Sequence, residues 1–158
     1  MSLGVVKMDN VRENKVIIRH MTLDDVPAII ALDRELNSGS GLLSYNDMAT
    51  IERGGRLDLN FVAEVDVKIG GFILAQLTYL MIPFTEVCII QGIFADPKYH
   101  EHHLGSKLMQ ALLDHCQTEG INRIRTLIPK HNIELQQFAE RHGFQRSNII
   151  NFDKIFDS

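Results

Sequence analysis

The 158-residue sequence lacks an apolar run long enough to cross a membrane. A membrane-spanning helix needs about 18 or more consecutive apolar residues, whereas the longest apolar stretches here, 70–77 and 87–94, have the length of strands. Residues 1–10 lack the apolar core of a signal peptide, and we expect them to be disordered or partly a remnant of cloning. We therefore expect a cytoplasmic protein that does not bind a membrane.

The sequence also lacks the basic charge of most nucleic-acid-binding proteins. Its formal net charge is −4, so we expect no nucleic-acid partner. Only two cysteines are present, Cys88 and Cys116, and each stands inside an apolar pattern. Buried free thiols are therefore the favoured interpretation over a disulfide.

Repeats, low-complexity tracts and long linkers are absent as well, which predicts one domain over residues 1–158. Hydrophobic residues make up 45% of the chain, enough for a sizeable core. The periodicity of the apolar residues predicts strands at 16–19, 60–65, 69–80, 87–94, 123–128 and 148–155, and helices at 24–36, 45–53, 104–119 and 132–142.

The order of these elements predicts an α/β (α+β) fold. The strands at 60–65 and 69–80 are separated by a short polar turn, which indicates an antiparallel hairpin. The strand–helix–strand segment 87–128 predicts a parallel pair joined by a right-handed crossover. We therefore expect a mixed sheet with helices on both faces.

The most informative segment is 87–106, in which an apolar strand leads through a polar loop into a helix. The free N–H groups and the dipole of a helix start attract anions, so a phosphate group is the natural ligand. The spacing of the glycines fits neither a Walker loop nor the dinucleotide fingerprint.

Three of the seven histidines, His100, His102 and His103, stand in this loop. Protonated imidazoles donate hydrogen bonds to phosphate oxygens, and a plain solvated loop is the alternative. A zinc site needs four ligands, whereas so short a loop comfortably offers two at most. We therefore expect no metal there.

The loop and its surroundings match a known family. Residues 100–105, His-Glu-His-His-Leu-Gly, align with the loop Gln/Arg-x-x-Gly-x-Gly/Ala, in which Gly105 is the strict match. The frame around the loop matches more fully, through the strand at 87–94, Asp96-Pro97, Tyr99, residues 104–108, Asn132, Phe138 and the pair Gly143-Phe144. On this frame the chain resembles the GNAT acetyltransferase superfamily over about residues 16–155.

The resemblance implies a mostly antiparallel sheet with a central parallel strand pair. It also implies an N-acetyltransferase with acetyl-CoA as donor and a primary amine, on a small molecule or a peptide, as the directly attacking acceptor. The pantetheine arm would enter a splay between the strands at 87–94 and 123–128, and N–H groups of the loop would hold the pyrophosphate. The implied acetyl-CoA-binding residues are Ile93, Ala95, His100, Glu101, His102, His103, Leu104, Gly105, Ser106, Asn132 and Phe138.

Three departures from the family concern the chemistry. The first glycine position of the loop holds His103, and histidine tolerates a positive φ less well than glycine does. Ala139 stands where many members have a tyrosine that protonates the leaving thiolate; Tyr79 or Tyr99 can substitute only if the fold brings one close. Gln91, which cannot accept a proton, stands where some members have a general base.

We take Gln91 and Glu86, on the same predicted strand, as the candidate catalytic residues. Glu86, and Glu35 at the end of the first helix, can relay a proton through water, although a solvated surface carboxylate is the favoured interpretation of each. Acid–base groups contribute about 10²–10⁴-fold, so their loss weakens catalysis without excluding it. The alternatives are a weakly active or inactive acyl-CoA-binding regulatory module on the same fold, and an interaction domain independent of CoA.

The C-terminal end is also short for the family. Its members usually end in two strands after the position of Gly143-Phe144, whereas we expect one here, at 148–155. An unpaired sheet edge invites pairing with another chain. We therefore expect a homodimer.

Overall fold

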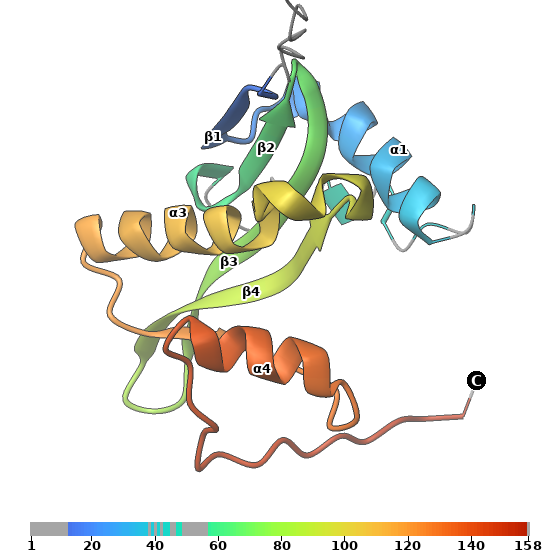
Figure 1. The fold of residues 1–158 in the computed structure, drawn as a ribbon. Coiled ribbons are helices and arrows are strands. Elements are labelled where there is room, and N and C mark those ends of the chain that lie inside the picture. Colours follow the sequence, from blue (N-terminus) through green and yellow to red (C-terminus); the bar gives the residue numbers. More distant parts are fainter. Residues whose placement is uncertain are drawn as a thin grey trace, which may run out of the picture.

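The protein is described by a computed structural model that covers residues 13–37, 39, 41, 43–44, 47–48 and 57–157 (Figure 1). In chain order the elements are β1 (Val16–His20), the 3₁₀ turn η1 (Leu23–Asp25), α1 (Val26–Leu36), the 3₁₀ turn η2 (Leu57–Leu59), β2 (Phe61–Val65), β3 (Lys68–Leu80), β4 (Thr85–Ala95), the 3₁₀ segment η3 (Pro97–His102), α3 (Leu104–Thr118), β5 (Ile124–Thr126) and α4 (Ile133–Arg141). The expected helix at 45–53 lies largely outside the described residues.

Within these residues the strands form a five-stranded sheet in the order β1-β2-β3-β4-β5. Neighbouring strands are antiparallel except β4 and β5, which run parallel. The two-residue turn between β2 and β3 has positive φ at Asp66 (49°) and Val67 (72°), as tight hairpins require. The expected mixed, mostly antiparallel sheet with a parallel pair is therefore confirmed.

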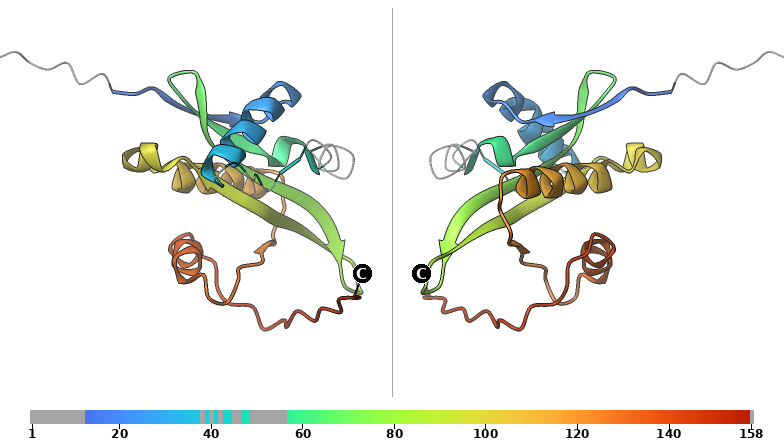
Figure 2. Two further views of the ribbon diagram at one scale, coloured as in Figure 1. Left: turned by 90° about the vertical axis from the view of Figure 1, so that its right-hand side faces the viewer. Right: turned by 90° about the vertical axis from the view of Figure 1, so that its left-hand side faces the viewer.

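Helices cover both faces of the sheet, as expected (Figure 2). On one face α1 buries Ile29, Ile30 and Leu32 against Val62, Phe72 and Leu74. On the other face α3 buries Leu104, Leu108 and Leu112 against Ala63, Ile73 and Ala75. The two sets alternate along β2 and β3 because successive side chains of a strand point to opposite faces.

The two cysteines are buried free thiols, as expected. Cys88 on β4 meets Cys116 on α3 in the core between sheet and helix. A hydrogen bond with Cys116, together with burial, raises the pKa of Cys88. Cys88 is therefore not an activated nucleophile.

The expected strand at 148–155 is wrong. Residues 149–157 have no regular secondary structure, and their large apolar side chains are exposed, including Phe152 (89%) and Ile155 (88%). The neighbouring edge strand, β5, is only three residues long, so it offers little for a sixth strand to pair with.

Among the described residues, no helix combines the length and the apolarity that crossing a bilayer demands.

Candidate functional site

The outer edge of β4 is paired with β5 along its first half only. The parallel pairing with β5 covers three residue pairs, from Cys88 with Ile124 to Ile90 with Thr126, whereas β3 accompanies β4 along its whole length. Beyond Ile90 the described strands therefore leave the outer edge of β4 open. Such an edge presents backbone N–H and C=O groups to any strand-like partner. Ile93 and Ala95 stand on this open half.

A β-bulge in β4, opposite β3, lies at the point where β4 and β5 part. Leu74 of β3 faces Gly92, but the next residue, Ala75, faces Ile90. Gln91 is thus the extra residue on β4, and such a bulge bends a strand and redirects its side chains. Nothing in the sequence around Gln91 signals the bulge, because its position depends on the register of two strands.

The open half of β4 leads directly to the start of α3. Asp96 follows β4, its side chain accepts a hydrogen bond from the Lys98 N–H (3.0 Å), and η3 then carries the chain to His103. His103 precedes α3 without a side-chain cap. Because the first N–H groups of a helix have no intrahelical acceptor, those of Leu104, Gly105 and Ser106 remain available to an anion.

His103 adopts the left-handed conformation, with φ 51° and ψ 44°. This is the position where the resembling family has glycine, so the backbone keeps the turn although the residue type differs. Histidine is among the residues enriched there, at some cost in strain.

The three loop histidines do not converge on one point. His102 Nε2 lies 3.1 Å from Asn14 Nδ2, and exposed His100 lies 4.0 Å from the Glu101 carboxylate. Among the residues that the structure describes, they form no group of three metal-ligating side chains. They surround the start of α3 as solvent-accessible groups.

Helix α4 approaches α3 at the same place. Asn132 begins it as a cap, with Oδ1 accepting from the Leu135 N–H (3.1 Å). The ring of Phe138 lies against Gly105, since a Cβ added there would stand 3.6 Å from Phe138 Cε2. The next residue, Ala139, is buried (6% exposed). Phe138 thus places α4 beside the N-terminus of α3.

The structure does not bring the candidate catalytic residues together. Gln91 is exposed and donates from Nε2 to Gln76 Oε1 (3.0 Å). Glu86 accepts a hydrogen bond from Tyr79 (3.2 Å) near the β3–β4 turn; five residues at about 3.3 Å each separate it from Gln91.

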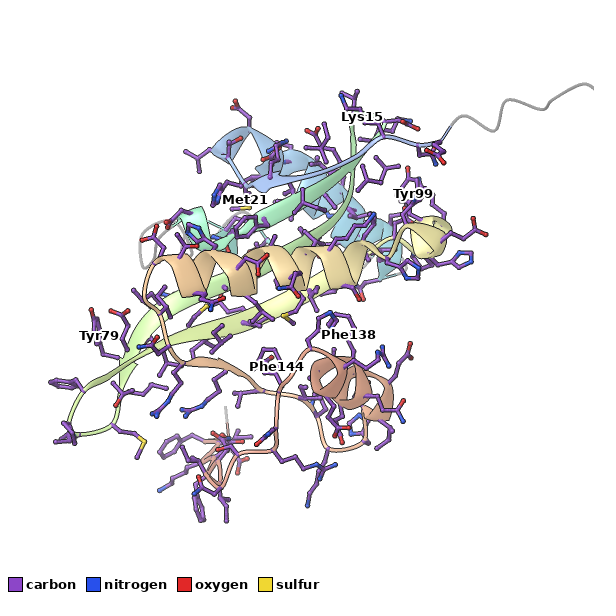
Figure 3. All side chains as sticks on the ribbon, turned by 60° about the vertical axis from the view of Figure 1, so that its left-hand side comes forward. Lys15, Met21, Tyr79, Tyr99, Phe138 and Phe144 are labelled. Atoms are coloured by element: carbon purple, nitrogen blue, oxygen red, sulfur yellow. The ribbon has the colours of Figure 1, made fainter. Side chains whose placement is uncertain are left out.

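The two candidate tyrosines lie apart from each other, and neither stands on β4. Figure 3 shows Tyr79 near the β3–β4 turn and Tyr99 beside the start of α3. The ring of Tyr99 rests on Gly70 of β3, and Tyr99 lines a groove of about 550 Å³ with Glu35, Asp96 and Lys98. The residues that line this groove do not include Gln91 or Ile93. No sequence pattern predicts the groove, because its walls come from residues of β1, η1, α1, β2, β3 and η3, which are distant in the chain.

Comparisons with known proteins show the family of the chain. The model of the acetyltransferase (GNAT) family matches residues 31–144. A comparison with curated protein sequences finds no match.

Several solved structures share the fold. A possible acetyltransferase from Clostridium difficile 630 superposes with a TM-score of 0.74 at 18% identity, covering 90% of this chain and 99% of its own. The aminoglycoside N-acetyltransferase AAC(6')-Iy in complex with CoA gives 0.73 at 19% identity, with 92% and 97% covered. Glucosamine-6-phosphate N-acetyltransferase from Arabidopsis thaliana gives 0.68 at 19% identity, with 90% and 99% covered. Because the family model spans well over half of the residues, the chain belongs to the acetyltransferase (GNAT) family.

Proposed function

We propose that this protein is an N-acetyltransferase that transfers an acetyl group from acetyl-CoA to a primary amine. The observation that carries the proposal is the continuity of two features. The outer edge of β4 opens after Ile90, and the same strand leads through η3 to the uncapped start of α3. The open strand edge suits the amide groups of a pantetheine arm, and the helix start suits a pyrophosphate.

The donor would lie along both features. Backbone groups at Ile93 and Ala95 would pair with the two amides of the pantetheine arm, as an added strand does. The N–H groups between Glu101 and Ser106 would hold the pyrophosphate, because the helix dipole favours negative charge there. Phe138, which lies against Gly105, would border the passage between α3 and α4.

The transfer itself needs few groups from the chain. A backbone N–H of the bulged part of β4 would polarise the thioester carbonyl, as an oxyanion hole does. The amine nitrogen forms a bond to the carbonyl carbon, the carbon–sulfur bond breaks, and the amine proton leaves to water. The thiolate then takes a proton from water, because Ala139 supplies none. Holding both reactants together is the main contribution of this site.

Gln91 is a positioning residue in this scheme. Its amide, held by Gln76, can hydrogen-bond an acceptor amine but cannot take its proton. The side chain of Glu86 is engaged by Tyr79 near the hairpin turn. Because the site lacks an acid–base group, we expect a kcat about 10²–10⁴-fold lower than that of an enzyme that has one.

A second candidate function is a regulatory module that binds acyl-CoA without turning it over. Ala139 in place of the tyrosine and Gln91 in place of the base favour it. Both functions share the donor site, and they differ in whether an amine is consumed.

The donor site is tested by isothermal calorimetry with acetyl-CoA. Ser106→Glu places a carboxylate in the first turn of α3, where we expect it to repel the pyrophosphate and weaken binding by at least about tenfold, or 1.4 kcal/mol. Ser106→Gln is the matched control of nearly equal size and should bind within about threefold of wild type. Ser106→Glu should not unfold the chain, because an acidic residue in a first turn stabilises a helix by about 0.3–1 kcal/mol. Ser106→Gln should not either, because glutamine is a better helix former than serine. Absence of binding to the wild type, or equal binding by the two variants, contradicts the proposal.

The acceptor is tested by thiol release with a panel of primary amines. Aminoglycosides and glucosamine-6-phosphate come first, because the names of two structural neighbours include them; lysine, polyamines and peptides with free N-termini follow. Release that depends on the amine supports the transferase. Donor binding without release for any amine supports the regulatory module.

Two further expectations, phosphate contacts of the loop histidines and a homodimer, are tested by separate measurements. If imidazolium groups contact the pyrophosphate, acetyl-CoA affinity falls from pH 5.5 to 8, over which histidines ordinarily lose their charge; a flat profile that replacing His100, His102 and His103 by Ala leaves unchanged contradicts the contact. The homodimer remains a prediction, and a clean monomer mass by gel filtration at micromolar protein would contradict it.

A further inference from the structure

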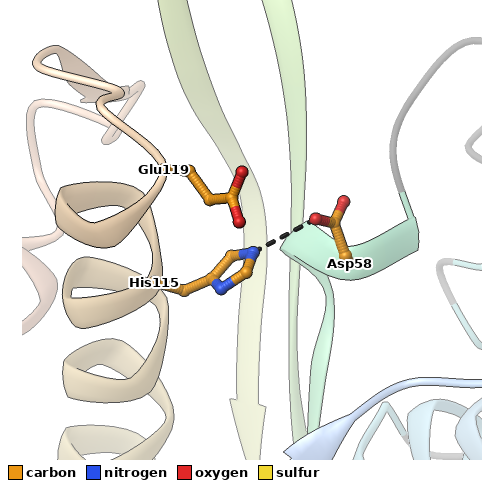
Figure 4. A group of neighbouring side chains, drawn as sticks. All are labelled: Asp58, His115 and Glu119. Carbon is orange, nitrogen blue, oxygen red and sulfur yellow. Dashed lines mark hydrogen bonds and ion pairs between the residues drawn. The ribbon is translucent and has the colours of Figure 1, made fainter.

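Far from the donor site, three side chains meet at the other end of α3. His115 and Glu119 stand one turn apart on α3 and its C-terminal cap, and Asp58 reaches them from η2 (Figure 4). Each offers one metal-ligating atom, and these atoms all lie within 4.8 Å of one another. Residues four apart share one face of a helix, which places His115 and Glu119 on the same side.

The closest pair already has the spacing of two ligands on one ion. His115 Nε2 lies 3.2 Å from Asp58 Oδ2. Zinc binds imidazole nitrogen and carboxylate oxygen at about 2.0–2.2 Å with tetrahedral angles, which puts two such ligands about 3.3 Å apart. The observed 3.2 Å hydrogen bond therefore has a length that two ligands of one shared ion would also have, and an ion would replace this hydrogen bond.

Packing holds the imidazole in place, and the third side chain is exposed. The His115 side chain is only 18% exposed, and its ring packs edge-on against those of His20 and Phe61, at centroid distances of 4.9 and 5.8 Å. A half-buried histidine whose ring is fixed by packing loses little side-chain freedom when it binds an ion. The exposed Glu119 carboxylate already lies within 4.8 Å of the other two ligand atoms.

We propose that Asp58, His115 and Glu119 bind a divalent transition-metal ion, with water completing the coordination. The nitrogen ligand favours zinc and its neighbours over magnesium and calcium, which prefer oxygen alone. The site ties η2 to α3. It is structural, since ten residues of helix, about 15 Å, separate His115 from Gly105 at the donor site.

The test is a competition titration of the chelator-treated full chain with Zn²⁺ against a fluorescent zinc indicator. We expect one ion per chain with micromolar or tighter affinity, weakened at least tenfold by Glu119→Gln and by His115→Gln. Glu119→Gln carries the test if the packed His115 variant does not fold. The matched control is the variant with His100, His102 and His103 all replaced by Ala, which should bind as the wild type does.

Thermal unfolding gives a readout independent of the indicator and of activity. Free Zn²⁺ at about 100 times the dissociation constant should raise the unfolding midpoint of the wild type by about 5 °C or more, whereas Mg²⁺ and Ca²⁺ should not. Absence of stoichiometric Zn²⁺ binding overturns the proposal. Wild-type affinity in both Glu119→Gln and His115→Gln, or loss of the ion only in the loop-histidine variant, overturns it as well.

Discussion

The ring of Phe138 on α4 lies directly over Gly105 in the first turn of α3. A Cβ added at Gly105 would stand 3.6 Å from Phe138 Cε2 and 3.8 Å from Cζ, which is ordinary van der Waals contact. The glycine is therefore open enough for a methyl group in the unliganded protein. The packing of α4 therefore does not require a glycine at this position. The absence of a side chain instead leaves room for a ligand at the start of α3.

Gly105→Ala should consequently fold as well as the wild type. We expect a free energy of unfolding equal to the wild type or up to about 1 kcal/mol higher, because alanine is the better helix former. The matched substitution Gly71→Ala should cost about 1–3 kcal/mol, since its Cβ would stand 2.8 Å from the Phe94 carbonyl oxygen in the packed sheet. Urea denaturation measures both. Equal stabilities of the two variants would show that these contacts do not limit the fold.

The left-handed conformation of His103 makes a second prediction. At φ 51°, glycine is unstrained, whereas a β-branched residue is a strong outlier. His103→Gly should stay within about 1 kcal/mol of the wild type, because relief of strain offsets the greater freedom of the unfolded chain. His103→Val should lose about 1–2 kcal/mol more than His103→Gly does. Chemical denaturation compares the three proteins, and a valine variant as stable as the glycine variant would contradict the strained turn.

The parts of the fold that could be predicted are those that depend on residues close together in the sequence. The hairpin strands at 60–65 and 69–80 and the helices at 104–119 and 132–142 each depend on residues a few positions apart, and each is present near its expected bounds. Residues 148–155 are also rich in apolar residues, yet they have no strand, because a strand also needs an edge long enough to pair with.

The parts that could not be predicted depend on distant residues. The bulge at Gln91 comes from the register between β3 and β4, which two glutamines in an apolar strand pair do not reveal. Asp58 and His115 lie 57 residues apart, so no spacing rule links them. For the same reason the sequence could not predict how far the loop at 100–106 lies from Gln91 or Glu86.

The ion-pair network at the start of α1 predicts a pH dependence of stability. Arg19 donates to both carboxylate oxygens of Asp25, at 2.8 Å each, and to Glu64 at 2.7 Å. These hydrogen bonds, the one from Arg19 foremost, hold the pKa of Asp25 below its ordinary value, although burial opposes the shift. A lowered folded pKa means that the ionised carboxyl stabilises the fold.

Asp25→Asn should therefore lower the free energy of unfolding by about 1–3 kcal/mol at pH 7. The difference from the wild type is full above the unfolded pKa of an aspartate, about 3.9, and it declines as the pH falls through the lower folded pKa. Denaturation at several pH values from 7 to 2 measures it. Asp24→Asn, at the exposed neighbouring position, is the control and should stay within about 0.5 kcal/mol at every pH. A difference between wild type and Asp25→Asn that does not change with pH would show that packing, rather than charge, is what the substitution removes.

The final prediction addresses the missing acid at Ala139. If the absence of a phenolic proton donor beside the leaving thiolate limits turnover, Ala139→Tyr should raise kcat relative to Ala139→Phe, a variant of nearly the same volume without the hydroxyl. Ala139 is buried, so both variants should lose about 1–3 kcal/mol of stability by overpacking, and this shared cost cancels in the comparison. General acid catalysis is worth about 10²–10⁴-fold when the donor is well placed, so a ratio of tenfold or more is the expected result for an imperfectly seated tyrosine. The ratio of the two kcat values, followed by thiol release at saturating acetyl-CoA, is the measurement. Equal kcat values would mean that protonation of the thiolate is not the step that the alanine slows.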